Sequence, residues 1–364
     1  MTYLDYQATT PPAPEAVEAM RPWLADGFAN PHSAHAPGRR AKAAVEAARE
    51  AVGDLLPPGG AVSFTSGATE ALNWAIKGTR GPIVTLATEH AAVLDTVAAL
   101  AGQGREVTIV PVGPDGLIDL NAARAAIRPG IGLVAAMLVN NEIGVIQPIA
   151  AIADLAHAAG ATMLCDAVQG YGREIISDAC DLVAISAHKI HGPKGVGALW
   201  IRDGVALDPL LHGGGQEAGG RSGTLSPMLC AGFGAAATLA KQRFGADRAH
   251  VAQLFRAAHR ALGSAGWTLN GSLDERYPGN LNMRRPGLDV ARLMSDLRDI
   301  AFSAGSACAS GSGRPSHVLR ALGLADGDAR SSIRLGFGRY TSEEELMSAI
   351  ERIDAAARAQ QVAA

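Results

Sequence analysis

Between Ala61 and Trp200, short apolar runs alternate with amphipathic stretches. The runs are continuously apolar instead of alternating with polar residues, which indicates strands covered on both faces, as in a parallel sheet. Ligands of such sheets bind beyond the carboxyl ends of the strands. The pattern predicts strands at 61–66, 83–87, 106–112, 132–139, 162–167, 181–187 and 197–201, and helices at 67–78, 91–102, 117–127 and 149–160.

The pattern changes after about His250. We expect a helix at 251–266, then shorter mixed elements and a last helix at 342–360. The sequence therefore predicts an α/β protein with a large domain at 13–249, built on a mainly parallel central sheet. Residues 1–12 and 250–364 would form a smaller α+β domain. No Pro/Gly-rich linker marks the boundary.

Composition narrows the possible functions. Of the 364 residues, 48% are hydrophobic and the mean hydropathy is +0.11, enough for a large core. The net charge of −3 gives no basic field for nucleic acid or an anionic membrane. No apolar run approaches the roughly 18 residues of a membrane span. Because the first residues lack a secretory pattern, we expect a cytoplasmic protein.

The cysteines and the nucleotide-binding signatures exclude further classes. Four cysteines without a CxxC pair indicate neither a disulfide framework nor a zinc site. No GxxxxGK[ST] motif occurs. Loose GxGxxA matches begin at Gly130 and Gly213, but neither leads from a strand into a helix, so dinucleotide binding is weakly supported.

Lys189 follows the predicted strand at 181–187, within the segment SAHKIHGPKG. A lone lysine at such a place is usually solvated. Next to a turn with glycine and proline, however, it suits an amine that must swing and form a Schiff base. Asp166 ends another predicted strand, with Gln169 three residues later. It either caps the next turn or keeps a pyridinium nitrogen protonated, as in pyridoxal phosphate (PLP) enzymes.

The segment SGATE at 66–70 stands between a predicted strand and a predicted helix. Its small residues leave free N–H groups at a helix N-terminus, which is a ready phosphate site. Taken alone, Ser66 is as easily explained as an N-cap. The order of these three segments and their shared place at strand ends favour a PLP site.

Longer blocks of sequence point to one family. They are YLDYQATTP at 3–11, NPHSAH at 30–35, TSGATEALN at 65–73, TEH at 88–90, NNEIGVIQP at 140–148, DAVQ at 166–169, SAHKIHGPKG at 186–195, HGGGQEAGGRSGT at 212–224, SAGSACASGSGRPSHVLRALG at 303–323 and SSIRLGFGRYTSEEE at 331–345. Over nearly its whole length the chain thus resembles the PLP-dependent cysteine desulfurases of the NifS/IscS type, in the class V aminotransferase group. The resemblance implies a transferase of PLP fold type I.

The resemblance also implies a role for individual residues. Lys189 would bond the cofactor, Asp166 would pair with its ring nitrogen, and Gln169 would donate to its phenolic oxygen. His90 would stack on the ring and act as an acid or base. The phosphate cup would consist of Ala68, Thr69, Ser186, His188 and, from the other subunit of a homodimer, Thr224. Asn141 and Arg334 would bind the substrate, and Asn141 would also contact the cofactor.

Cys308 lies in SAGSACASGSG, a run of Ser, Ala and Gly that offers no hydrophobic anchor and predicts a mobile surface loop. A thiolate on such a segment suits attack on a substrate sulfur. We interpret Cys165 and Cys230 as small buried residues of apolar segments. The role of Cys180 is ambiguous, and a structural role is favoured. We therefore expect conversion of L-cysteine to L-alanine with a Cys308 persulfide, and no resident metal, although Cys308 is a possible transient iron–sulfur ligand.

The alternatives are selenocysteine lyase, another class V reaction, or a catalytically idle binding protein. Intact Lys189, Asp166 and His90 disfavour the idle protein, and Cys308 disfavours transamination. Ala309, Ala218 and Gly220 depart from the family pattern, with small effects expected. We expect a protein sulfur acceptor, such as an iron–sulfur scaffold. Because the chain ends at AARAQQVAA, without the tail by which some relatives dock a scaffold, the acceptor's identity stays open.

Overall fold

The computed structural model describes residues 1–304 and 316–362. Its largest sheet contains all seven predicted strands. Six of them run in one direction, and β8 is antiparallel to both of its neighbours. The spatial order is β2 (Gly60–Thr65), β8 (Gly197–Arg202), β7 (Leu182–Ser186), β6 (Thr162–Asp166), β5 (Leu133–Met137), β3 (Ile83–Leu86) and β4 (Val107–Val110). The predicted mainly parallel sheet is confirmed.

Helices cover both faces of this sheet, which explains the continuously apolar strands. Alternate residues of one strand face opposite layers: Val183 and Ile185 of β7 join one buried cluster, and Leu182 and Ala184 join the other. One layer contains α3 (Ala68–Gly78) and α4 (Ala91–Ala101); the other contains α2 (Ala36–Gly53), α5 (Leu120–Ala126), α6 (Ile149–Ala158) and the first half of α7 (Pro227–Ser264).

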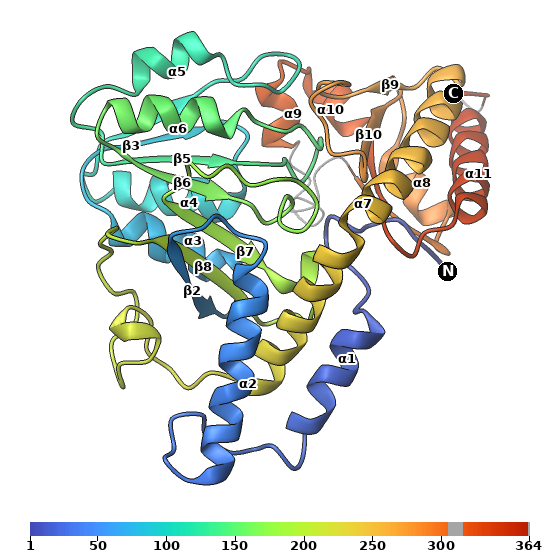
Figure 1. The fold of residues 1–364 in the computed structure, drawn as a ribbon. Coiled ribbons are helices and arrows are strands. Elements are labelled where there is room, and N and C mark those ends of the chain that lie inside the picture. The colour runs from blue at the N-terminus through green and yellow to red at the C-terminus, as the bar shows by residue number, and fades with distance from the viewer. Residues whose placement is uncertain (305–315, 363–364) are drawn as a thin grey trace.

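A second region lies beside the large sheet and holds both labelled chain ends (Figure 1). Its core is a separate buried cluster that includes Leu4, Leu281 and Leu335. A four-stranded sheet has the order β12 (Ser303–Ala304), β13 (Ser332–Gly336), β10 (Asn280–Arg284), β9 (Thr268–Leu269), and β1 (Thr2–Tyr3) pairs with β11 (Ile300–Ala301). Its helices are α8 (Val290–Asp296), α9 (His317–Ala321), α10 (Asp326–Arg330) and α11 (Glu343–Val362).

The long helix α7 connects the two regions (Figure 1). The predicted helix start at 251 is wrong, because the helix begins at Pro227 after the N-cap Ser226 and runs through for 38 residues. Glycines in its first half hid it from the pattern. At Gly234 a Cβ atom would stand 2.7 Å from Ala48 Cα, so the glycine lets α2 pack closely. We propose that the chain is divided as predicted, into a large domain at 13–249 and a smaller domain of 1–12 and 250–364. Helix α7 crosses the boundary between them.

Two short elements lie near the beginning of the chain. α1 (Pro14–Met20) packs against α7 and leads into a 3-10 turn at Arg21–Trp23. Within residues 1–304 and 316–362, no helix combines the length and apolar character that crossing a membrane requires.

Candidate active site

A cavity of about 540 Å³ lies at the carboxyl ends of the large sheet's parallel strands. This is where the strand pattern predicts a ligand. Loops after β2, β3, β5, β6 and β7 line it, together with Gln7 and Ala8 from the start of the chain. Ten of the predicted site residues are among the lining residues: Ala68, Thr69, His90, Asn141, Asp166, Gln169, Ser186, His188, Lys189 and Arg334.

Lys189 ends the 3-10 turn Ala187–Lys189 that directly follows β7. Its Nζ atom donates to the carbonyl oxygens of Gln7 at 2.5 Å and Ala8 at 2.8 Å. Burial, helped by the charges of Arg173 and Arg334, lowers the pKa of the Lys189 amine to about 7. A substantial share of this amine is therefore neutral near pH 7, and the neutral amine is the nucleophile that attacks an aldehyde.

Asp166 is the last residue of β6 and is 4% exposed. Its Oδ1 accepts from the Val168 N–H at 3.0 Å, and among the described residues it forms no ion pair. Burial raises the pKa of the Asp166 carboxyl, while the Val168 N–H and the charges of His90 and Lys189 oppose that rise. A buried carboxylate without a cation leaves a place for a protonated ring nitrogen from a ligand.

The N-terminus of α3 is open toward the cavity. Its N-cap is Gly67, and no side chain caps it. The first amides of a helix lack partners within the helix, so Ala68 and Thr69 offer donors to an anion. Gly197 on β8 makes room for this turn, because a Cβ atom there would stand 2.7 Å from the Gly67 carbonyl carbon. The sequence predicts a phosphate cup at this turn, whereas the role of Gly197 in making room for it was not predicted.

Glu70 supports the same turn from one residue further along α3. Its Oε2 accepts from the Ser66 N–H at 2.7 Å, and Arg221 pairs with its Oε1 at 2.6 Å. Burial raises the pKa of Glu70, but Arg221 and Ser66 lower it more, so the carboxyl stays ionised. Arg221 thereby offsets the negative charge that Glu70 would place beside a bound phosphate.

His90 is the N-cap of α4, where its Nδ1 accepts from the Ala92 N–H at 3.0 Å. Burial lowers the pKa of the His90 ring, so the ring is mainly neutral. Since Nδ1 accepts, the proton of the neutral ring sits on Nε2. His188 directly precedes Lys189 in the chain. Burial and the charge of Lys189 lower its pKa to about 4, and its Nδ1 contacts Thr9 Oγ1 at 3.1 Å.

Gln169 has partners that the sequence did not reveal. Its Nε2 donates to the Gln7 carbonyl at 2.8 Å, and its Oε1 accepts from Arg173 Nη1 at 2.9 Å. Arg173 also donates to the Lys189 carbonyl. Neither Gln7 nor Arg173 was predicted as a site residue. The YLDYQATTP block contains Gln7 and was a usable signal, whereas no motif contains Arg173.

Arg334 enters from β13 of the second region and is 1% exposed. Its Nη2 pairs with Asp5 Oδ1 at 2.7 Å, and its Nη1 donates to the Asn141 carbonyl at 3.0 Å. Its Nε has no partner among the described residues. A guanidinium group beside the cavity with a donor to spare suits a substrate carboxylate.

Of the predicted site residues, Thr224 and Cys308 remain to be placed. Thr224 is exposed and stands outside the wall. Cys308 lies outside the described residues. The other three cysteines are buried and free of disulfides, as predicted for Cys165 and Cys230. A hydrogen bond with Cys180, and then burial, raises the pKa of Cys165, and burial raises the pKa of Cys230 to about 12.

These features fit PLP: open helix amides for a phosphate, a buried carboxylate without an ion-pair partner among the described residues for a ring nitrogen, and a lysine with a lowered pKa for the aldehyde. The α/β fold and this site define the class as PLP-dependent enzymes. The aminotransferase class-V family model matches residues 2–348. The chain belongs to this family and, within it, to the cysteine desulfurases, as its relatives establish.

The mitochondrial cysteine desulfurase of Saccharomyces cerevisiae is 46% identical, over 94% of this chain and 72% of its own length. Cysteine desulfurase IscS of Rickettsia bellii is 44% identical, over 96% of this chain and 90% of its own length. A solved NifS-like protein is 32% identical, with a TM-score of 0.90, over 97% of this chain and 98% of that one. The predicted family is confirmed, and the alternative reactions are not favoured.

Proposed function

We propose that this chain, a PLP-dependent cysteine desulfurase, converts L-cysteine to L-alanine and collects the sulfur atom as a persulfide on Cys308. The observation that supports it best is that one cavity holds both Lys189, with a pKa of about 7, and Asp166, which has no ion-pair partner among the described residues. PLP, when bound, supplies an electron sink for the charge that develops at the substrate Cα.

Three groups of this chain would bind the cofactor. The amides of Ala68 and Thr69 hold the phosphate at the start of α3. Asp166 keeps a proton on the ring nitrogen, since a buried carboxylate is stabilised by the positive charge. Lys189 provides the amine that bonds the aldehyde carbon.

Other groups would bind and activate L-cysteine. Arg334 holds the substrate carboxylate with its guanidinium group, beside Asn141, whose carbonyl accepts from its Nη1 at 3.0 Å. Once displaced from the cofactor, Lys189 takes the Cα proton and later returns a proton to the product. His90 offers the Nε2 proton of its neutral ring.

The sulfur step is balanced within enzyme and substrate. The Cys308 thiolate bonds to the substrate sulfur, and the substrate Cβ–S bond breaks. The electron pair of that bond stays on the carbon, which takes up a proton and becomes the methyl group of alanine. The enzyme keeps the sulfur as a persulfide and passes it to an acceptor.

Cys308→Ala tests this function. Cofactor attachment and the absorbance change on adding L-cysteine should survive, because Lys189, Asp166 and Arg334 are unchanged. Alanine formation should stop, since Cys165, Cys180 and Cys230 are buried. In the parent chain, mass spectrometry after turnover should locate the persulfide on Cys308. Alanine and sulfide release at the parent rate in Cys308→Ala would contradict the relay and favour selenocysteine lyase.

We also propose a homodimer in which Thr224 of each subunit completes the other's phosphate site. Its support is the exposed position of Thr224, away from its own cavity. A mixed dimer of one Thr224→Val chain and one Lys189→Ala chain tests this. If Thr224 acts across the dimer, the site with the intact Lys189 also receives an intact Thr224, and activity returns. If Thr224 acts within its own chain, neither site is complete and activity stays low. We also propose a cytoplasmic location, although the names of two yeast relatives place those proteins in mitochondria. A scaffold protein for iron–sulfur clusters is the proposed acceptor.

A further inference from the structure

Arg173 stands behind the wall of the large cavity and bonds two residues of that wall. Its Nη1 donates to Gln169 Oε1 at 2.9 Å, and its Nη2 donates to the Lys189 carbonyl. Gln169 belongs to the loop after β6, and Lys189 ends the 3-10 turn after β7. One guanidinium group therefore joins the two segments that carry these side chains.

These bonds close a ring through the Gln7 carbonyl, which accepts from Gln169 Nε2 at 2.8 Å and from Lys189 Nζ at 2.5 Å. A guanidinium group only donates, so it must face the oxygen of the Gln169 amide. The amide nitrogen then points the other way, and it carries two hydrogens. Gln7 takes one of them, which leaves the second for an acceptor in the cavity that Gln169 lines.

Arg173 is itself held in place. Its guanidinium carbon lies 5.2 Å from the centre of the Tyr277 ring, and Tyr277 is buried. The neighbouring carboxylate, Glu174, pairs with Arg248 at 3.2 Å. Arg173 is thus fixed on an aromatic ring, and its next neighbour in the chain pairs with a different cation.

Arg173 also acts on the Lys189 amine through its charge. After burial, the charge of Arg173 is the largest cause that lowers the pKa of Lys189. Arg334 acts in the same direction, whereas the carboxylates Asp5 and Asp166 raise that pKa. The rings of His90 and His188 also face the amine.

We propose that Arg173 is a positioning residue for cofactor attachment: its guanidinium group holds the Lys189 turn and the Gln169 amide so that both reach the same bound PLP. This inference rests on the proposed roles of Lys189 and Gln169. A guanidinium group can bond both partners because its donors form a planar fork, whereas the ammonium group of a lysine is a point charge. Substitutions can therefore separate the shape of Arg173 from its charge.

The test follows covalent attachment of PLP to cofactor-free protein by stopped-flow absorbance over a range of pH. Arg173→Met removes both the bonds and the charge. Its plateau rate, measured where the amine is neutral, should fall about tenfold. The midpoint of its profile should move to higher pH, because a protonated amine is easier to hold without a neighbouring cation. In Arg173→Lys the plateau rate should also fall, but the midpoint should stay close to that of the parent.

The absorbance maximum of the bound cofactor is a second readout. If Arg173 acts through Gln169, then Arg173→Met and Gln169→Met should shift this maximum in the same direction. The double variant should shift it no further than Gln169→Met alone, because both changes remove the same interaction. Additive shifts would show that Arg173 does not act through Gln169 and would overturn that part of the proposal.

Arg105→Met is the matched control, since Arg105 also bonds backbone carbonyls, those of Gly81 at 2.6 Å and Ile76 at 2.7 Å. Ile76 lies in the last turn of α3, whose first turn faces the cavity. This variant should keep the parent plateau rate, midpoint and absorbance maximum. Equal changes in both methionine variants would overturn the positioning role.

Parent values in Arg173→Met would overturn it too. So would a shifted midpoint with a parent plateau rate and absorbance maximum, because the charge alone would then explain the effect. If Arg173→Met does not fold, Arg173→Lys is used instead, and a parent plateau rate and absorbance maximum there overturn the positioning role.

The two proposals fail differently. If borohydride reduction of the parent finds PLP on a residue other than Lys189, the proposed function is wrong. If PLP is found on Lys189 and the Arg173 variants behave like the parent, only the positioning role is wrong.

Discussion

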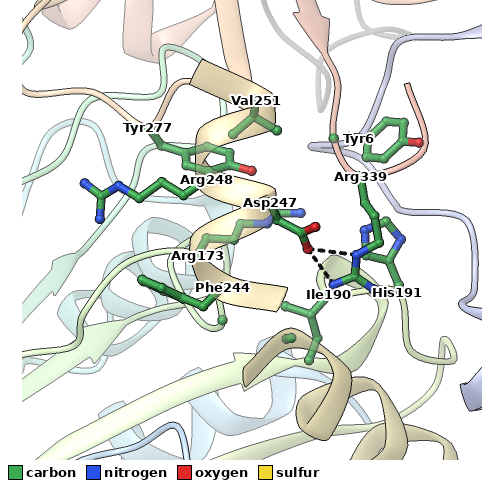
Figure 2. A pocket seen from close by; sticks show the side chains of 13 residues that line it. Tyr6, Arg173, Ile190, His191, Phe244, Asp247, Arg248, Val251, Tyr277 and Arg339 are labelled. Carbon is green, nitrogen blue, oxygen red and sulfur yellow. Dashed lines mark hydrogen bonds and ion pairs between the residues drawn. The ribbon is translucent and has the colours of Figure 1, made fainter. Parts of the chain in front are cut away.

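Two pockets flank the short segment from Lys189 to His191, and they differ in whether their buried charged groups are paired within the protein. On one side lies the cavity of about 540 Å³, where the partners of Lys189 Nζ among the described residues are the carbonyl oxygens of Gln7 and Ala8. On the other lies a pocket of about 30 Å³ between α7 and the loop after β13 (Figure 2). There Arg339 and Asp247 form an ion pair at 2.8 Å (Figure 2).

Burial depresses a pKa on each side. It lowers the pKa of Lys189 to about 7 and, with the charge of Arg339, that of His191 to about 3. His191 is tied down: its N–H donates to Thr10 Oγ1 at 2.7 Å, and its Nδ1 donates to the Pro11 carbonyl at 2.8 Å. The small pocket thus pairs its buried guanidinium with a carboxylate of the protein, although Arg339 Nη1 has no hydrogen-bond partner among the described residues. The large cavity instead keeps an amine and a carboxylate available to a ligand.

Lys189→Ala should have the largest effect. It removes the amine that the cavity keeps reactive, so covalent cofactor attachment and alanine formation should both be lost. Borohydride reduction of the parent, followed by peptide mass spectrometry, should find the cofactor on Lys189. Attachment at Lys194, which also lines the cavity, would show that Lys189 is not the reactive amine.

Asp166→Asn keeps the size of the side chain and removes its charge. We expect turnover to fall roughly 100- to 1,000-fold, because the ring nitrogen loses the partner that stabilises its proton. Phosphate binding at α3 is separate, so the cofactor should still bind. Steady-state kinetics and cofactor titration measure the two effects, and near-parent turnover would exclude this role for Asp166.

The pH dependence of cofactor attachment tests the depressed pKa directly. The neutral amine reacts, and the folded-state pKa of Lys189 is about 7. The rate at which cofactor-free protein bonds PLP should therefore rise with pH, about tenfold per unit below 7, and level off above it. Stopped-flow absorbance measures this profile. A rate still rising tenfold per unit at pH 9 would show that the Lys189 pKa is ordinary.

Asp247→Ala should affect stability more than chemistry. Arg339 is 5% exposed and would lose its carboxylate, so we expect the free energy of unfolding to fall by about 2 kcal/mol. Lys241, on the same helix as Asp247, forms an exposed ion pair with Asp54. Asp54→Ala breaks that pair and should change the free energy of unfolding by less than about 0.5 kcal/mol. Urea unfolding measures both. A large loss of cofactor attachment in Asp247→Ala would remove the distinction between the pockets.

Much of this molecule was predictable from local sequence. All seven strands of the large sheet followed from apolar runs, because burial on both faces leaves a strand no polar positions. The places of Lys189, Asp166 and SGATE at strand ends followed in turn, since parallel strands bring their carboxyl ends to one edge. The cysteine desulfurase family followed from motifs spread along the chain.

Only the tertiary structure decided what surrounds those residues. The carbonyls of Gln7 and Ala8 that hold Lys189 are more than 180 positions away in sequence. The Asp5–Arg334 ion pair joins the two ends of the chain. No periodicity encodes such contacts, because they depend on how separately folded segments pack. The same reason explains the bonds of Arg173 to Gln169 and Lys189 and the bond between Ser316 and Glu142, because the partners come together only in the folded chain.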